Sequence, residues 1–337
     1  MYRPSPSSTL SASSTLSVSA SSTSSARQTR LFATLISARH CPGSNMFAFK
    51  EVKPDPSKKV RYTLYTGDFT LHPYIRKDIQ TLQKRIICRY PSYNYSTRGI
   101  WDRVYYDDTF QKFYRRFPSF HETVQVCSQL IRSICIRQRR SLFFDIRTFG
   151  HEVVVLKALN KVNLNLRCDD HKNRHRPIQC FLDINTLDKP KLDSLMQLYT
   201  SLQRSIDTSI DLDSVPHIML GNLSHMLKMV RETSSSSSVS EWTNTLRKYT
   251  SRYHGGYVKL STKQFLCPRR RNQVYFIKKN DHPRPDTRYI FYATHPNHSQ
   301  IQQFKHLLKV KRTQKTFDCV PCNFKIAEQD VQDICNL

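Results

Sequence analysis

The chain has 337 residues, of which 38% are hydrophobic and 11% aromatic, and its 53 Lys and Arg against 26 Asp and Glu give a formal net charge of +27. This length suggests two domains, or one large domain with tails, and the positive balance favours a polyanionic partner because like charges destabilise the compact state. Seven glycines are too few and too scattered for a phosphate-binding loop or a dinucleotide-binding fingerprint, and no run of about 18 apolar residues could span a bilayer.

Residues 1–45 contain no acidic residue and combine a Ser-rich composition with four arginines. This composition is typical of an organellar transit peptide, and the alternative is a disordered Ser-rich tail. We therefore leave this segment out of the predicted fold. Ten cysteines at irregular spacing indicate a reduced intracellular protein. The expected location is the mitochondrion if residues 1–45 are a transit peptide, and the alternative is the nucleus.

Residues 46–233 are predicted to form a first domain that mixes helices with hairpins. A Gly-bearing turn inside an alternating apolar pattern predicts a β-hairpin over 60–71, and helical spacing predicts a helix over 75–86. Ser119 and Glu122 have the spacing of a capping box at the start of a helix. Further strands are predicted at 141–146, 153–156, 162–166 and 178–184, and further helices at 190–206 and 216–231.

The serine run from 234 to 238 predicts a flexible linker over 234–240 and a domain boundary there. Beyond it, residues 241–337 are predicted to form a smaller, basic, β-rich domain that also contains helices. Its strands are expected at 256–260, 273–277 and 288–292, with a helix at 301–308. The predicted fold class is therefore α+β in two domains.

Residues 247–315 contain 17 Lys and Arg against two acidic residues, and aromatic residues are interleaved with these cations. Cations neutralise phosphates and aromatic rings stack on unpaired bases, so this composition favours single-stranded nucleic acid, with RNA ahead of DNA. The alternative is a β-rich domain with its rings in the core and its cations solvated. The predicted binding residues are Arg252, Lys259, Arg269, Arg270, Arg271, Tyr275, Lys278, Lys279, Arg288, Lys309, Lys311 and Arg312, together with Arg174 and Arg176 in a basic loop.

Two groups of Cys and His residues have spacings that suggest zinc. Cys319 and Cys322 can grip one ion from a tight turn, and His295 and His298 are the predicted partners that complete four ligands. The alternative is a reduced, inert cysteine pair. The second group is Cys168, His171, His175 and Cys180, but the basic residues among them favour a phosphate-binding loop tip over a dication site.

Asp145 and Asp183 are each expected at the end of a predicted strand. Paired strand-end carboxylates can hold two magnesium ions for phosphoryl transfer, and with His254 they suggest an enzyme of the archaeo-eukaryotic primase-polymerase type as an alternative. The commoner role of an isolated Asp is to cap a turn or to pair with an arginine.

The leading hypothesis is a non-enzymatic nucleic-acid-binding protein that acts in packaging, ribonucleoprotein assembly or gene regulation. The alternatives are the primase-polymerase-like enzyme and a viral nucleocapsid or matrix component that self-associates. Insertion into a membrane is not expected.

Overall fold

The computed structural model describes residues 16–17, 29–55, 59–71, 73–89, 100–168, 177–204, 216–233, 256–267, 270, 273–279, 286–308 and 317–319. Helices and strands are mixed, as the predicted α+β class requires. The chain divides into unit 1, Met1–Arg116 with Thr294–Lys325, and unit 2, Phe117–Ala293 with Ile326–Leu337. The predicted boundary at 234–240 falls inside unit 2, because strands from both sides of it pair in one sheet.

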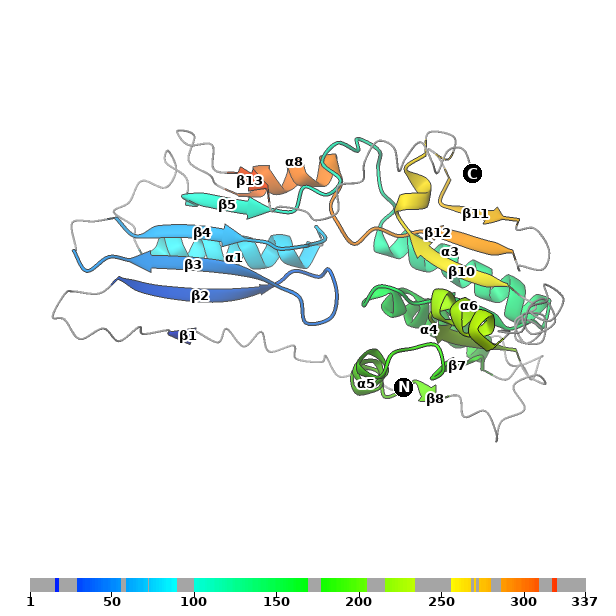
Figure 1. The fold of residues 1–337 in the computed structure, drawn as a ribbon. Coiled ribbons are helices and arrows are strands. Elements are labelled where there is room, and N and C mark those ends of the chain that lie inside the picture. Colours follow the sequence, from blue (N-terminus) through cyan, green and yellow to red (C-terminus); the bar gives the residue numbers. More distant parts are fainter. Residues whose placement is uncertain are drawn as a thin grey trace. The chain divides into compact units, whose positions relative to one another are not determined.

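Unit 1 is built on a six-stranded sheet (Figure 1). The three neighbouring pairs among the first four strands are antiparallel. The last two pairs, which join the fourth strand to the fifth and the fifth to the sixth, are parallel. In spatial order the strands are β1 (Leu16–Ser17), β2 (Arg30–Ser37), β3 (Asn45–Val52), β4 (Arg61–Tyr65), β5 (Arg103–Tyr106) and β13 (Phe317–Cys319).

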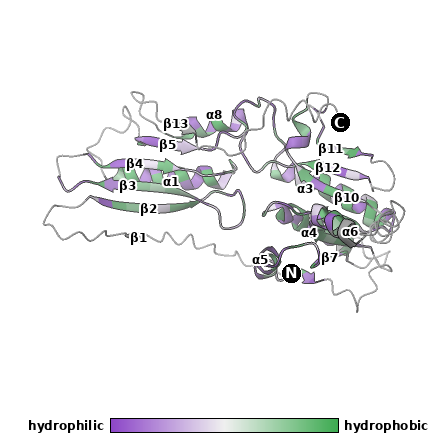
Figure 2. Ribbon diagram, in the orientation of Figure 1, coloured by the Kyte–Doolittle hydropathy of each residue, from purple (hydrophilic) through white to green (hydrophobic). Residues whose placement is uncertain are grey.

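Two helices, α1 (Pro73–Arg89) and α8 (His298–Leu307), add buried residues to the core of unit 1. The helix predicted at 75–86 is confirmed, and both hydrophilic and hydrophobic residues occur along its length (Figure 2). Phe304 of α8 is fully buried, and its ring centroid lies 4.7 Å from that of Phe69. Residues more than 200 positions apart in the chain therefore share one hydrophobic core.

Two predictions for unit 1 are wrong. Arg30–Ser37 is a strand paired along its whole length with β3, so the last part of the segment 1–45 contributes to the fold despite its tail-like composition. Residues 60–71 do not form a hairpin, because only Arg61–Tyr65 is a strand. After it the chain bonds elsewhere: the Thr66 backbone N–H donates to the Tyr105 carbonyl, and the Thr70 N–H donates to the Ala38 carbonyl.

Unit 2 is built on a seven-stranded sheet in which every neighbouring pair is parallel except the edge pair β11–β12. In spatial order the strands are β11 (Tyr275–Lys278), β12 (Thr287–Phe291), β10 (Tyr257–Ser261), β6 (Leu142–Asp145), β9 (His217–Gly221), β7 (Gln179–Leu182) and β8 (Gln203–Arg204). Strands predicted at 141–146, 178–184, 256–260, 273–277 and 288–292 are confirmed.

Helices cover both faces of this sheet. On one face α3 (Phe120–Ile131), α4 (His151–Cys168) and α5 (Lys189–Leu198) share a core with Leu142 and Phe144. On the other face α6 (Leu223–Thr233) packs with Phe143. The capping box of Ser119 and Glu122 is confirmed at the start of α3, which continues as a π-helix over Arg132–Arg137. A short 3₁₀ helix spans Lys263–Phe265.

Two further predictions are wrong in unit 2. The strands expected at 153–156 and 162–166 are parts of α4, whose buried Val154, Ala158 and Val162 recur at four-residue spacing. The helix expected over 216–231 is a buried strand followed by a shorter helix, and the break falls at Gly221 and Asn222. Asn222 accepts from the His225 backbone N–H and so caps α6.

We predict that Phe304→Ala destabilises unit 1 by about 3–5 kcal/mol, because it empties a fully buried ring site in the shared core. Tyr74→Ala is the matched control, since it removes an aromatic side chain that is 58% exposed in the same unit and should cost about 0.5 kcal/mol or less. Urea unfolding followed by circular dichroism measures both. Equal losses of stability in the two variants would contradict the described core.

Candidate nucleic-acid interface

One row of side chains crosses four strands of unit 2 on a single face of the sheet. Lys259 of β10 pairs in register with Asp145 of β6 on one side and with Tyr289 of β12 on the other. Tyr289 in turn pairs with Phe276 of β11. Directly paired residues in a sheet point to the same face, so an acid, a base and two aromatic rings stand side by side.

The carboxylate of Asp145 anchors this row. Its side chain is 1% exposed, so it is costly to bury unless its oxygens are satisfied. The backbone N–H of Leu223 donates to Oδ1 at 2.9 Å, which ties the carboxylate to the start of α6. Oδ2 of Asp145 forms ion pairs with two cations, Arg147 Nε at 2.9 Å and Lys259 Nζ at 3.4 Å. Arg147 also donates to Ser224 Oγ in the first turn of α6.

The connections place this row at a topological switch point. Strand β6 continues through α4 to β7, whereas its neighbour β9 continues through α6 to β10, and these two helices cover opposite faces. In parallel α/β sheets, ligands bind outside the carboxyl ends of the strands where the connections diverge in this way. Asp145 is the last residue of β6 and Asn222 directly follows β9, so both lie at this point.

Aromatic rings and an arginine form a stack at the other end of the row. The rings of Phe276 and Tyr289 are nearly parallel, with their centroids 4.9 Å apart and an interplanar angle of 11°. The guanidinium carbon of Arg270 lies 3.8 Å from the centroid of Phe276. Lys278 lies two residues from Phe276 on the same strand and therefore faces the same side. Both rings are half-buried.

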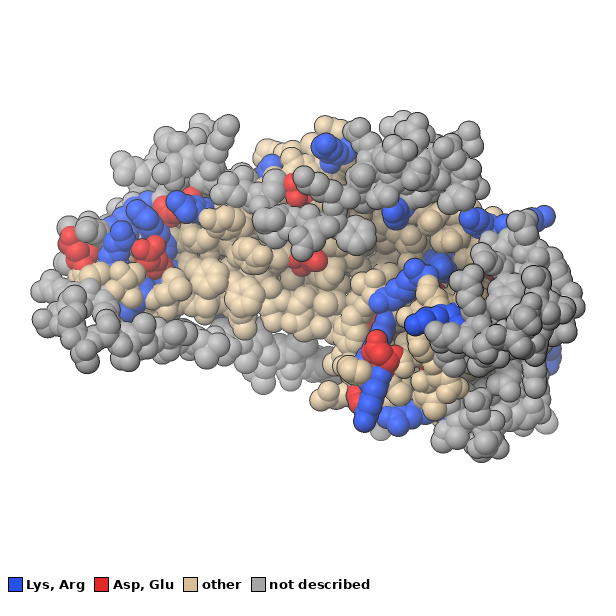
Figure 3. Space-filling model, in the orientation of Figure 1, with Lys and Arg blue, Asp and Glu red and all other residues tan. Residues whose placement is uncertain are grey.

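The electrostatics of the row are dominated by positive charge. Burial lowers the pKa of Lys259, the repulsion of Arg147 and Lys278 adds to this lowering, and the attraction of Asp145 partly opposes it. One carboxylate thus neutralises only part of a cluster of cations. Figure 3 shows several Lys and Arg side chains, in blue, on the visible surface of this unit. An anion bound there would relieve the repulsion that acts on Lys259.

The predicted binding residues divide between the two faces of the sheet. Lys259, Arg270 and Lys278 lie on the face of the row, whereas Tyr275 packs against the core on the opposite face and is hydrogen-bonded to Arg288 there. Lys279 is exposed just after β11. Eight more predicted residues lie outside the described part of the chain: Arg174, Arg176, Arg252, Arg269, Arg271, Lys309, Lys311 and Arg312.

Arg288 is held close to the backbone on that opposite face. A Cβ atom on Gly256 would come within 2.1 Å of Arg288 Nη1, and Gly256 has a φ of +94°, which side chains other than that of glycine rarely adopt. This close approach gives Arg288 a packing role.

The alternative catalytic set is only partly brought together. Asp145 ends its strand as predicted, and Asp183 directly follows β7, but strand β9 lies between β6 and β7. Asp145 is engaged with its two cations, and Asp183 Oδ1 accepts from the Asn185 backbone N–H. The third member, His254, lies outside the described residues.

The predicted zinc ligands that the structure describes belong to unit 1. His295 Nδ1 lies 2.6 Å from Asp107 Oδ2, whereas His298 Nδ1 bonds to the Gln111 carbonyl at 2.9 Å. Cys319 ends β13, and Cys322 lies outside the described residues. In the second group, His171 and His175 also lie outside them, and Cys180 is in the hydrophobic core of unit 2, where burial raises the pKa of its thiol.

None of the predicted sites includes Phe276 or Tyr289 of the row, or Arg147 beside Asp145. The rings stand out in the sequence as part of the aromatic and basic pattern, but their face becomes known only from the register of β10, β11 and β12. Arg147 follows Asp145 by two residues, and this proximity to a strand-end acid is the signal that points to it.

Comparison with known proteins finds no protein-family model that matches the chain and no curated protein that is similar to it. Among the described residues, no helix combines the length and apolar character needed to cross a membrane. The case for a function therefore has to be made from the geometry of the row.

We predict that Asp145→Asn destabilises unit 2 by about 2 kcal/mol or more, because Lys259 stays largely buried without its counter-charge. The loss at Arg147 contributes less, since this side chain is 53% exposed and solvent screens it.

Asp193→Asn is the matched control for this substitution. Asp193 pairs with Arg204 at 3.7 Å while both side chains are at least half exposed, and such a pair contributes about 1 kcal/mol or less. Chemical denaturation compares the two variants. If Asp145→Asn lowered the stability no more than Asp193→Asn does, the buried ion pairs would not hold the sheet and α6 together.

Proposed function

We propose that the protein binds single-stranded nucleic acid, RNA ahead of DNA, through the row Asp145–Lys259–Tyr289–Phe276 of unit 2 and the cations beside it. The observation that carries this proposal is the placing of stacked aromatic rings and an excess of cations on one face of the sheet. We call this surface the binding row. It contains three of the predicted nucleic-acid-binding residues, Lys259, Arg270 and Lys278.

The cations of the binding row are suited to phosphate groups. Arg147 and Arg270 present guanidinium groups, whose planar array of N–H donors matches the oxygen atoms of a phosphate. Lys259 pairs with Tyr289, and Lys278 of β11 pairs with Thr287, two residues along the same strand, so both add point charges near this ring. Asp145 holds Arg147 and Lys259 in place, so part of the ordering entropy of these side chains is lost before a ligand binds.

The rings of the binding row are suited to unpaired bases. A sheet that displays aromatic residues on one face can stack two or three bases of a single strand, and it cannot reach bases that are paired inside a duplex. Arg270 covers one face of Phe276, and a guanidinium plane is itself a surface on which a base can stack. These features favour single strands over double helices.

We predict that Lys278→Ala weakens the binding of a single-stranded oligonucleotide and lowers the slope of log K against log salt by about 0.7, the value expected for one phosphate contact. Fluorescence anisotropy at several salt concentrations measures both quantities. Lys161→Ala is the charge-matched control, because Lys161 is exposed on α4, which covers the opposite face of the same sheet. An equal change of slope in the two variants would show that binding follows net charge and not the binding row.

We predict that Tyr289→Ala reduces affinity for single strands by about 1–3 kcal/mol, the usual contribution of one stacked base, while Tyr289→Phe keeps most of it. The salt slope should stay unchanged in both variants, since no phosphate contact is removed. The measurement compares RNA, DNA and duplex probes of one length. If the Tyr289→Ala variant bound single strands as tightly as the unaltered protein does, base stacking on Tyr289 would be ruled out.

A further inference from the structure

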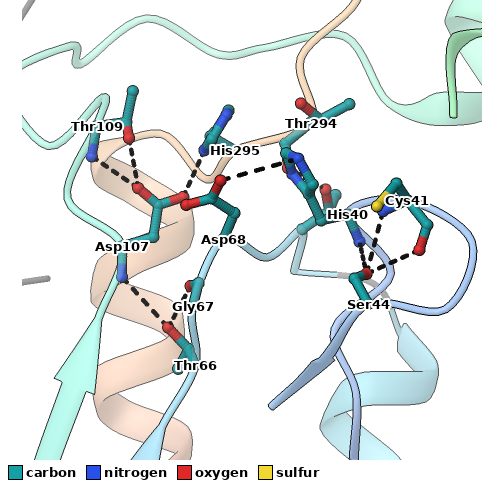
Figure 4. Close-up of polar contacts among 11 residues, drawn as sticks. His40, Cys41, Ser44, Thr66, Gly67, Asp68, Asp107, Thr109, Thr294 and His295 are labelled. Atoms are coloured by element: carbon teal, nitrogen blue, oxygen red, sulfur yellow. Dashed lines mark hydrogen bonds and ion pairs between the residues drawn. The ribbon is translucent and has the colours of Figure 1, made fainter. Parts of the chain in front are cut away.

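Four side chains from separate parts of unit 1 converge at one end of its sheet (Figure 4). His40 lies in the connection between β2 and β3, Asp68 follows β4, and Asp107 follows β5. His295 precedes α8 and belongs to the segment with which the chain returns to unit 1. His40, Asp68 and His295 each offer one ligand atom, and these three atoms lie within 4.8 Å of one another.

Each histidine has its Nδ1 engaged with a fixed group of unit 1. His40 Nδ1 lies 3.1 Å from the Thr294 carbonyl oxygen, which can only accept, so the proton is on Nδ1 and Nε2 carries the lone pair in the neutral ring. His40 Nε2 faces Asp68 Oδ2 at 3.9 Å. His295 Nδ1 contacts the Asp107 carboxylate at 2.6 Å, which leaves Nε2 of His295 available.

The groups behind the histidines are themselves fixed. Asp107 is buried, and its Oδ1 accepts from both the backbone N–H and the hydroxyl of Thr109, at 2.9 and 2.6 Å. The Thr294 carbonyl also accepts from the Thr70 hydroxyl. On the other side, Ser44 Oγ accepts from the backbone N–H groups of His40 and Cys41 and closes the loop that presents His40. Neither ring depends on solvent for its orientation.

We propose that His40 Nε2, His295 Nε2 and the Asp68 carboxylate bind a divalent transition-metal ion, with Thr294 and Asp107 as the outer groups that orient the two imidazoles. Metal-binding histidines usually donate their second ring N–H to a backbone carbonyl or a carboxylate, and this cluster contains one of each. The two rings also meet edge to face, with centroids 4.8 Å apart.

The ligand set defines the class of ion. Two imidazole nitrogens and one carboxylate oxygen suit zinc, iron(II) and cobalt(II) better than calcium or magnesium, which prefer oxygen ligands. Metal–ligand bonds of about 2.0–2.2 Å bring the ligand atoms of a tetrahedral site to about 3.3 Å from one another. Asp68 is 54% exposed and can rotate inward to close the remaining distance. Three protein ligands leave a position for water or a substrate, which is typical of catalytic and not of structural zinc sites.

This site differs from the zinc site expected from the sequence, with which it shares only His295. His298 bonds to the Gln111 carbonyl, and its ring packs on Tyr114 with centroids 4.3 Å apart. It is not among the three residues whose ligand atoms converge in the described part of the chain. The proposal is also independent of the binding row, because all of its residues belong to unit 1.

The test is a titration of the metal-free, full-length protein with zinc in competition with a chromophoric chelator. We expect one zinc ion per chain, and a loss of affinity of about 100-fold or more in His40→Ala and in Asp68→Ala. Asp107→Asn should weaken binding by about 10- to 100-fold without removing a ligand. His298→Ala, three residues from His295, is the matched control and should bind as the unaltered protein does.

Two readouts keep the result interpretable. Zinc should raise the Tm of the unaltered protein and not that of His40→Ala, and circular dichroism without metal shows whether each variant is folded. Cobalt(II) should give d–d absorption bands without a thiolate charge-transfer band. Absence of zinc binding by the folded, unaltered protein would overturn the proposal. So would a thiolate band together with loss of binding in Cys319→Ser and full binding in His40→Ala, since that pattern assigns the ion to the cysteine pair.

Discussion

The carboxylate of Asp145 is the interaction on which the arrangement of unit 2 depends. It ends a strand whose four residues are all buried, and it has to be satisfied where water does not reach. Its partners come from the start of α6, from the residue two positions along the chain, and from a neighbouring strand. Satisfying one buried charge therefore fixes the helix start, the end of β6 and the register of β10 together.

The same interaction orders two cations of the proposed binding row. Long basic side chains on a protein surface lose much conformational entropy when they bind a ligand. Here Lys259 is mostly buried and both it and Arg147 are held by the carboxylate before any ligand arrives. The carboxylate reduces the net charge of the surface, but the cations that remain outnumber it. The carboxylate thus weakens the long-range attraction of the surface for an anion, and in return it fixes the positions of Lys259 and Arg147.

Local patterns in the sequence were sufficient for much of the secondary structure and for little of the sites. The capping box of α3 and the short apolar strands depend on neighbouring residues only, and they were predicted correctly. Helix α4 was mistaken for strands because its run of valines favours strands locally, whereas tertiary packing on the sheet decides the outcome. The serine run was read as a boundary, but β10 pairs with β6 across it.

The sites were harder to predict because their members are far apart in the chain. His40 and the Thr294 carbonyl are 254 positions apart, and no local pattern connects them. His295 was predicted as a ligand on spacing alone, and the partners that converge with it, His40 and Asp68, lie in segments that looked like a tail and a hairpin turn. The cations of residues 247–315 were visible from composition, but the face that each occupies follows only from strand register.

The discontinuity of unit 1 sets the order in which the protein can fold during synthesis. Residues 30–116 leave the ribosome early, but Ile301 and Phe304, which complete their core, follow only after the whole of Phe117–Ala293 has been made. At about 5–20 residues per second, this delay is roughly 10–40 seconds. The part of the core that Ile301 and Phe304 cover stays exposed for that time. The last-made segment of unit 1 therefore closes the first-made part, and unit 2 has all of its strands before unit 1 does.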